Sequence, residues 1–190
     1  EQVVLTPGCT FGLNAAIRSL VKSGDRVVIS GFEHNAVVRT LHALGAQVVV
    51  AGRKLFCQEE RLSQWEDALR QGVNVAVVTH VSNVFGYILP LEQIAELCHR
   101  YGVPLIVDAA QSAGTLPISL KKLDACYIAM PGHKGLLGPQ GVGVLLCNQN
   151  IDPLVFGGTG NASASRLMPE TLPERGEAGT VNVPGIGGLL

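Results

Sequence analysis

The chain has 190 residues, of which 47% are hydrophobic and 15% charged, with 23 glycines and a formal net charge of −1 at pH 7. This length allows one sizeable core and is too short for two complete domains. The sequence has no long basic run and no apolar run of membrane-spanning length. We therefore expect neither nucleic acid nor a membrane as a partner.

The cysteines form an odd set of 5 without a CxxC pair. This pattern is not typical of a disulfide framework or a zinc site, so we expect a reducing compartment, the cytoplasm, and no bound metal. The set consists of Cys9, Cys57, Cys98, Cys126 and Cys147.

Short apolar runs alternate with amphipathic stretches along the chain, which predicts an α/β fold with a mainly parallel sheet and crossover helices. In chain order, the predicted strands are residues 3–5, 26–30, 47–51, 75–79, 104–107, 125–128 and 142–146. The predicted helices are residues 13–22, 36–44, 61–70 and 91–101. The glycines that follow these helices are predicted C-caps, namely Gly24, Gly45, Gly72 and Gly102.

This regular alternation continues without a linker through residues 1–150, which are predicted to form the α/β core. Residues 151–190 are rich in glycine and proline and have little periodicity. A solvated tail would carry more charge, so we interpret them as an ordered extension of the same domain that leads toward a missing C-terminal domain. The chain begins at Glu1 and stops in a Gly-Gly-Leu-Leu run, and we interpret both ends as cut.

Ligands of open α/β sheets bind at the carboxyl ends of the strands, and this chain has conspicuous polar residues there. After the first predicted strand come Gly8, Cys9 and Thr10, at the start of a helix. The backbone N–H groups and the helix dipole of such a turn could hold a phosphate, and Thr10 could add a hydroxyl. Taken alone, the segment is better explained as an ordinary strand-to-helix turn.

The next two polar positions allow two interpretations each. His34 starts a predicted helix, where its imidazole could stack on a planar ring or move a proton, and a helix-terminal residue without a ligand explains it equally well. Asn83 follows the strand at residues 75–79, and it could donate to a ring oxygen or only shape the turn.

Asp108 closes the apolar strand at residues 104–107, and Gln111 follows it closely. A carboxylate in such a place is costly to bury unless a cationic or protonated group pairs with it. A pyridinium nitrogen is such a partner. The alternative is an aspartate that caps the following turn.

The predicted strand at residues 125–128 leads into a glycine-rich turn that contains His133 and Lys134. The small apolar neighbours should partly desolvate Lys134, which would lower its pKa and free its amine as a nucleophile. A Walker phosphate loop is a poor match, because the required GxxxxGK[ST] order is absent from the sequence.

Taken in order, these segments resemble the class V aminotransferase-fold enzymes that use pyridoxal 5'-phosphate (PLP), specifically the cysteine desulfurase and selenocysteine lyase branch. The resemblance covers nearly the whole chain and rests on the ordered set of motifs. These are residues 8–10 (GCT), 33–35 (EHN), 82–83 (SN), 107–112 (VDAAQS), 132–139 (GHKGLLGP), 157–160 (GGTG) and 177–182 (EAGTVN).

The resemblance implies that residues 1–150 bind PLP and that Lys134 holds it as a Schiff base. Lys134 would later move the Cα proton of the substrate. His34 would stack on the pyridine ring as the second catalytic residue, and Asp108 would pair with the ring nitrogen.

The resemblance also assigns the remaining contacts of the cofactor. Asn83 and Gln111 would contact the phenolic oxygen. The phosphate turn that Gly8 opens would hold the phosphate through Cys9, Thr10 and His133. Thr180 would reach the phosphate of a neighbouring subunit, which implies a homodimer with shared active sites.

The fold implied by the resemblance is the large domain of fold-type-I PLP enzymes. That domain is a mixed, mostly parallel seven-stranded sheet with one antiparallel strand and helices on both faces. Pro131 departs from the family pattern, because many relatives have a hydroxyl residue there that contacts the phosphate. The mobile-loop cysteine and the carboxylate-binding arginine of the family lie C-terminal to this chain, and none of the five cysteines is assigned the persulfide-forming role.

The activity implied is that of a cysteine desulfurase-like enzyme, which removes sulfur from cysteine and leaves alanine and a protein-bound persulfide. A sulfur-acceptor protein is a possible partner, and cysteine and selenocysteine are both candidate substrates. The alternatives are another class V reaction, such as transamination or selenocysteine lysis, and a catalytically incomplete dimerisation or folding unit. For this chain alone we expect PLP binding with little or no turnover.

Overall fold

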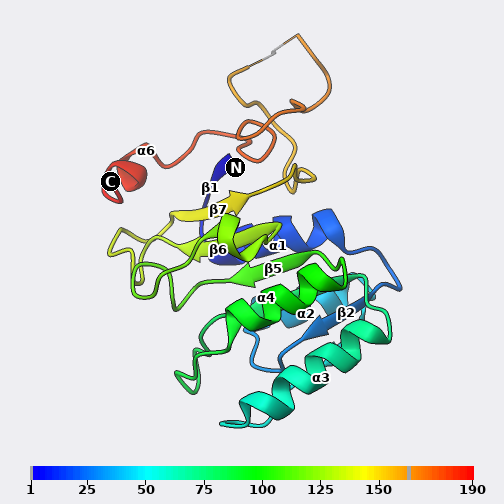
Figure 1. Cartoon of the computed structure of the whole chain (residues 1–190). Helices are drawn as coiled ribbons and strands as arrows, with labels where there is room; N and C mark the ends of the chain where they lie inside the picture. Colours follow the sequence, from blue (N-terminus) through cyan, green and yellow to red (C-terminus); the bar gives the residue numbers. More distant parts are fainter. Residues whose placement is uncertain (1, 162–163) are drawn as a thin grey trace.

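The computed structural model describes residues 2–161 and 164–190, and its centre is one seven-stranded sheet with the order β1-β7-β6-β5-β4-β2-β3 (Figure 1). The strands are β1 Gln2–Thr6, β2 Arg26–Ile29, β3 Gln47–Val50, β4 Val75–Thr79, β5 Leu105–Asp108, β6 Tyr127–Pro131 and β7 Gly143–Cys147. Strand β7 pairs antiparallel with both β1 and β6, and every other pair is parallel. The predicted mixed sheet with one antiparallel strand is confirmed.

Helices cover both faces of the sheet, as predicted (Figure 1). They are α1 Cys9–Leu20, α2 Asn35–Ala43, α3 Gln58–Arg70, α4 Leu91–Arg100, α5 Leu120–Leu123 and α6 Val183–Gly187. Side chains of β4 alternate between the two faces, so Val77 packs in the core under α1 and α2, and Val78 packs in the core under α3, α4 and α5. Trp65 of α3 is fully buried in the second of these cores.

Several element boundaries differ from the predicted ones. Helix α1 begins at Cys9 instead of residue 13, because its first turn is held by N–H groups of Phe11 and Gly12 that donate to the carbonyl of Gly8. Strand β6 begins at residue 127 instead of 125, because the N–H of Ala125 donates to the carbonyl of Leu120 and so belongs to the end of α5. The short helices α5 and α6 were not predicted, since four or five residues are too few to show a helical period.

The glycine caps are confirmed at three of the helix ends and wrong at the first. Gly45, Gly72 and Gly102 lie two positions after the last residues of α2, α3 and α4, directly after the C-cap residues, and have positive φ angles of 70°, 83° and 65°. Gly24 is not a cap, because α1 ends at Leu20 and the chain is already extended at the buried residue Val21.

The described part of the segment after β7 has one short helix, α6, and is otherwise irregular (Figure 1). It is tied to the sheet at edge strand β1, where the N–H of Leu5 donates to Glu177 at 2.6 Å. Arg175 donates to the carbonyl of the buried residue Ile151 at 2.6 Å. Residues around Glu177 therefore lie against the sheet edge, while the assignment of residues 151–190 to the same domain, the division at residue 150 and a further C-terminal domain stay predictions.

No helix within the described residues has both the length and the apolar character needed to cross a membrane.

Candidate functional site

A cavity of about 590 Å³ lies at the carboxyl edge of the sheet, a volume within the usual range for small-molecule sites. Strands β1, β2, β4, β5 and β6 all run in the same direction, so the turns that follow them meet at this edge. All predicted site residues except Thr180 line the cavity, namely Gly8, Cys9, Thr10, His34, Asn83, Asp108, Gln111, His133 and Lys134. Segments that are far apart in the sequence are thus brought together.

Thr180 lies in a second cavity of about 320 Å³, together with Leu5, Thr6 and Asn182. Pro7 and Phe11 line both cavities, so the turn between β1 and α1 forms the wall that separates them. Within one chain Thr180 does not face the other site residues. Its contact with a neighbouring subunit stays a prediction.

The turn between β1 and α1 has the features of an anion site. Gly8 is the N-cap of α1 and provides no side-chain acceptor. Within the described residues, the N–H groups of Cys9 and Thr10 have no recorded acceptor, so they are available to a ligand. Gly143 of β7 packs directly on this turn, because a Cβ atom at Gly143 would lie 2.7 Å from the backbone of Gly8.

Asp108 ends β5 at the floor of the cavity and is only 2% exposed. Its Oδ1 atom accepts from the N–H of Ala110 at 2.9 Å and from the thiol of Cys9 at 3.6 Å. Burial raises the pKa of Asp108, and the hydrogen bonds from Ala110 and Cys9 and the charges of His34 and Lys134 oppose this rise. The bond to Ala110 is the turn cap of the alternative interpretation, and the raised pKa shows that this bond does not compensate for burial.

His34 is the N-cap of α2, and its Nδ1 atom accepts from the N–H of Ala36 at 3.1 Å. In the neutral ring, the proton is therefore on Nε2. The side chain also lines the cavity, so the helix-terminal interpretation holds without excluding a ligand.

Glu33, directly before His34, is a residue whose role the sequence reasoning missed. Its carboxylate accepts from the N–H groups of Ser30 at 2.9 Å and Gly31 at 2.7 Å, and from Thr79 at 3.5 Å, so it joins the ends of β2 and β4. Burial raises the pKa of Glu33, and its hydrogen bonds to Ser30 and Gly31 oppose the rise. The available signal was an acidic residue in the short turn that follows the buried strand β2.

Lys134 is exposed, so the predicted desolvation of this lysine is wrong. Glycine next to Lys134 instead allows close packing between the loop after β6 and the loop after β5. A Cβ atom at Gly135 would lie 2.3 Å from the carbonyl oxygen of Ala113, and one at Gly114 would lie 2.2 Å from the carbonyl oxygen of Gly135. The glycines thus hold the lysine turn against the turn that follows β5.

The turn after β4 is shaped by the residue next to Asn83. The Oγ atom of Ser82 accepts from the N–H groups of Val84 and Phe85, at 3.3 Å each. Asn83 itself is exposed and lines the cavity, and Gln111 lines it from the turn after β5. Ser82 therefore has the turn-shaping role that was considered for Asn83.

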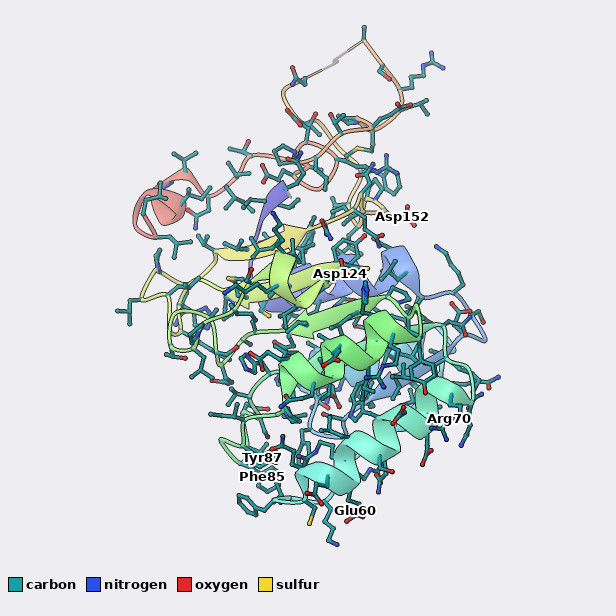
Figure 2. The ribbon with its side chains drawn as sticks, in the orientation of Figure 1. Glu60, Arg70, Phe85, Tyr87, Asp124 and Asp152 are labelled. Atoms are coloured by element: carbon teal, nitrogen blue, oxygen red, sulfur yellow. The ribbon has the colours of Figure 1, made fainter. Side chains whose placement is uncertain are left out.

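This turn is anchored from outside the cavity by Arg61 of α3, which is 1% exposed. Arg61 donates to the Oη atom of Tyr87 at 2.6 Å and to the carbonyl of Gly52 at 3.0 Å, and its guanidinium lies 4.7 Å from the Tyr87 ring centre. Phe85 packs edge-on against Phe32 with ring centres 6.0 Å apart. Phe85 and Tyr87 lie beside the start of α3 (Figure 2). An arginine in an amphipathic helix gives no sequence signal for such an anchor.

Two further residues line the cavity. Pro131, the predicted departure from the family pattern, is buried and brings a side chain without a hydroxyl to the cavity wall. Leu154 contributes a wall from the segment after β7, which no sequence signal indicated. Within residues 2–161 and 164–190, no group of three His, Cys, Asp or Glu side chains is arranged to hold a metal ion.

Comparison with known proteins identifies the family. The whole chain, residues 1–190, matches the family model described as aminotransferase class-V. The chain belongs to the aminotransferase class-V family. The predicted resemblance to the class V fold is thereby confirmed.

Individual members of the class V family support the cysteine desulfurase branch of the prediction. A probable cysteine desulfurase of Methanothermobacter thermautotrophicus is 31% identical over 201 residues, which is 100% of this chain and 50% of the relative. The solved cysteine desulfurase of Thermococcus onnurineus NA1 matches with a TM-score of 0.84 and 32% identity, over 100% of this chain and 50% of that one. A structure described as SspA in complex with cysteine matches with a TM-score of 0.80 and 27% identity, over 98% and 53%. The chain spans about half the length of the curated relatives it matches.

Proposed function

We propose that this chain binds PLP in the cavity of about 590 Å³ and forms the cofactor-binding half of a cysteine desulfurase. Lys134 would attach the cofactor covalently. The observation that carries the proposal is that an amine, a buried carboxylate and an uncapped helix N-terminus, from three distant segments, converge on one cavity.

The residues of the cavity fit the chemical groups of PLP. The free N–H groups of Cys9 and Thr10 at the positive end of the α1 dipole suit a phosphate. Asp108 has only neutral hydrogen-bond donors as recorded partners, so a protonated ring nitrogen would supply the positive charge that its buried carboxylate needs. The exposed amine of Lys134 suits an aldehyde.

When bound, PLP would supply an electron sink for chemistry at the Cα atom of an amino acid. Asp108 would keep the ring nitrogen protonated, and its burial would strengthen this interaction because the local dielectric is low. Lys134 would take and return the Cα proton. His34, oriented by the N–H of Ala36, would lie against the ring, and Asn83 and Gln111, which line the same cavity, would hold the phenolic oxygen.

Cysteine is the proposed substrate, and the names of the relatives and the cysteine complex of SspA support it. The nucleophilic thiol and the carboxylate-binding arginine would belong to the other half of the protein. Cys9 is a poor candidate for the thiol, because burial and the charge of Asp108 raise its pKa and keep it protonated. The proposal includes a homodimer in the cytoplasm, with Thr180 at the neighbouring phosphate and His133 at its own, and a sulfur-acceptor protein as partner.

The attachment of PLP to Lys134 is tested by incubating the protein with PLP, reducing it with borohydride and locating the modification by peptide mass spectrometry. We expect the label on Lys134 and its loss in Lys134→Ala. The matched control is Lys122→Ala, since Lys122 is an exposed lysine of α5 and should leave labelling unchanged. Equal labelling of several lysines, or labelling that persists in Lys134→Ala, would contradict PLP attachment at this site.

The reaction is tested separately with the complete protein and cysteine. We expect alanine and sulfide in equal amounts, the sulfide being released from the persulfide by a reducing thiol. If the complete protein binds PLP and makes neither product, the desulfurase assignment is wrong and another class V reaction takes its place.

A further inference from the structure

The first residue of α1, Cys9, connects the phosphate turn to Asp108. Its Sγ atom lies 3.6 Å from the Oδ1 atom of Asp108, across 99 positions of sequence, and its side chain lines the cavity. Ala110 donates its N–H to the same oxygen at 2.9 Å. Among the described residues both donors bind Oδ1, which leaves Oδ2 as the oxygen without a protein donor.

The charges of the two side chains determine which of them carries the proton. Burial and the negative charge of Asp108 raise the pKa of the Cys9 thiol, and Lys134 opposes this rise. The thiol bond in turn acts to lower the pKa of Asp108. Cys9 is therefore a neutral donor in this pair, and it is not a thiolate nucleophile.

We propose that Cys9 is a positioning residue, whose neutral thiol holds Oδ1 of Asp108 and thereby leaves Oδ2 for the protonated ring nitrogen of the cofactor. The identity of that cation rests on the proposed function, whereas the thiol–carboxylate contact does not.

A thiol is suited to this task because it is a weak donor. A carboxylate that accepts a strong hydrogen bond shares its charge with the donor, and less remains for a ligand. The thiol orients Asp108 and leaves more of its charge for the ring nitrogen. The series Ala, Cys and Ser at position 9 thus varies the donor strength from none through weak to strong, with nearly the same side-chain volume.

The contact is tested without cofactor by the pH dependence of Cys9 alkylation with iodoacetamide, measured by peptide mass spectrometry. In Asp108→Asn the shape is kept and the charge is removed, so the alkylation profile of Cys9 should move to lower pH. At pH 8 the alkylation rate of Cys9 should rise about tenfold for each pH unit by which the profile moves. Cys57, the N-cap residue of α3 and not a lining residue of the cavity, is the control in the same sample and should not change.

The same profile for Cys9 in the wild type and in Asp108→Asn, with the circular dichroism spectrum unchanged, would overturn the proposal. A profile that moves for Cys9 and not for Cys57 supports it.

The positioning role is tested with PLP by comparing affinity and the pH dependence of the cofactor's visible absorbance in the wild type, Cys9→Ala and Cys9→Ser. Loss of the donor should weaken PLP binding about fivefold in Cys9→Ala, and the hydroxyl of Cys9→Ser should restore part of the affinity, because it orients Asp108 but leaves less charge for the ring nitrogen. The absorbance midpoint should shift in opposite directions in the two variants, which a packing defect alone would not produce. If both variants match the wild type in affinity and midpoint, Cys9 has no positioning role.

The two arms separate this inference from the proposed function. A wild-type protein that shows the Asp108-dependent alkylation profile and binds no PLP would overturn the proposed function and support the thiol–carboxylate pair. A protein that binds PLP at Lys134 and shows no dependence of Cys9 on Asp108 would overturn the inference alone.

Discussion

At the residue scale, the buried carboxyl group of Asp108 lowers the stability of the folded chain while it forms part of the candidate ligand site. Its pKa is raised above the ordinary value of 3.8 by burial, so the native chain binds its proton more tightly than the unfolded chain does. The stability that this group contributes is therefore present below that ordinary value and is lost as the pH rises through the native pKa. At neutral pH the carboxylate destabilises the chain unless a cation joins it.

We expect Asp108→Asn to stabilise the protein in the absence of PLP, by roughly 0.5–2 kcal/mol at pH 8. The amide oxygen can still accept from Ala110 and Cys9, and the amide nitrogen takes the place of Oδ2 at the open cavity. The difference from the wild type should narrow as the pH falls toward 4, because the wild-type carboxyl takes up its proton more readily at lower pH. Urea unfolding at both pH values measures this, and a variant less stable than the wild type at pH 8 would contradict a penalty from the buried charge.

At the scale of loops and helices, the position of Lys134 depends on Gly114 and Gly135, because each allows close contact between the loop of Lys134 and the loop that follows β5. In Gly135→Ala the new methyl group would meet the carbonyl oxygen of Ala113, so one of the two loops must move. We expect a loss of about 1–3 kcal/mol in unfolding free energy and a marked loss of PLP attachment to Lys134. Unfolding curves and borohydride labelling measure the two effects.

The matched control for that substitution is Gly158→Ala, because a Cβ atom at Gly158 meets nothing within 4 Å and its φ angle is not positive. It should leave both stability and labelling near those of the wild type. If Gly135→Ala behaves like Gly158→Ala, the contact between the two loops does not hold Lys134 in place.

Arg61 is the corresponding anchor for the turn that contains Asn83. Arg61→Met keeps the length of the side chain and leaves the carbonyls of Gly52 and Lys54 and the hydroxyl of Tyr87 without their donor. We expect a loss of about 2–4 kcal/mol. Arg70→Met is the control on the same helix, because the Arg70 side chain is exposed and forms its ion pairs with Glu66 and Asp67 at the surface. It should change stability by less than about 1 kcal/mol (Figure 2). Similar losses of unfolding free energy in both variants would contradict a stabilising role of the buried contacts of Arg61.

Strands and the polar residues at their ends could be predicted from the sequence, because they depend on local periodicity and order. Contacts between side chains of different elements could not be predicted in this way. The buried run of β4 and the polar residues at strand ends are visible locally, so β4 was predicted with its exact bounds and the cavity residues were found. The carboxylate of Glu33 and the guanidinium of Arg61 have partners on other elements, and no local pattern reveals these partners. The desolvation of Lys134 was predicted wrongly for the same reason, since its glycine neighbours pack on a different loop.

At the scale of the whole molecule, one turn separates two cavities, and this arrangement bears on how subunits could share a site. Pro7 and Phe11 face both cavities, whereas Thr180 lines only the second. A residue on the far side of the phosphate turn cannot serve the phosphate of its own chain without passing that wall. It can do so for a neighbouring chain if a twofold axis brings the second cavity of one subunit to the first cavity of the other.

Two defective subunits should therefore complement each other. Thr180→Ala should weaken PLP binding, and Lys134→Ala should abolish covalent attachment. Lys134→Ala subunits keep Thr180 and Thr180→Ala subunits keep Lys134, so a mixed dimer has one site with both residues intact. Titration of the mixed protein with PLP should reveal a fraction of sites with wild-type affinity, and borohydride labelling should place the cofactor on the Thr180→Ala chain. If Thr180 acted within its own chain, the mixture would show only the average of the two parents, with no site of wild-type affinity.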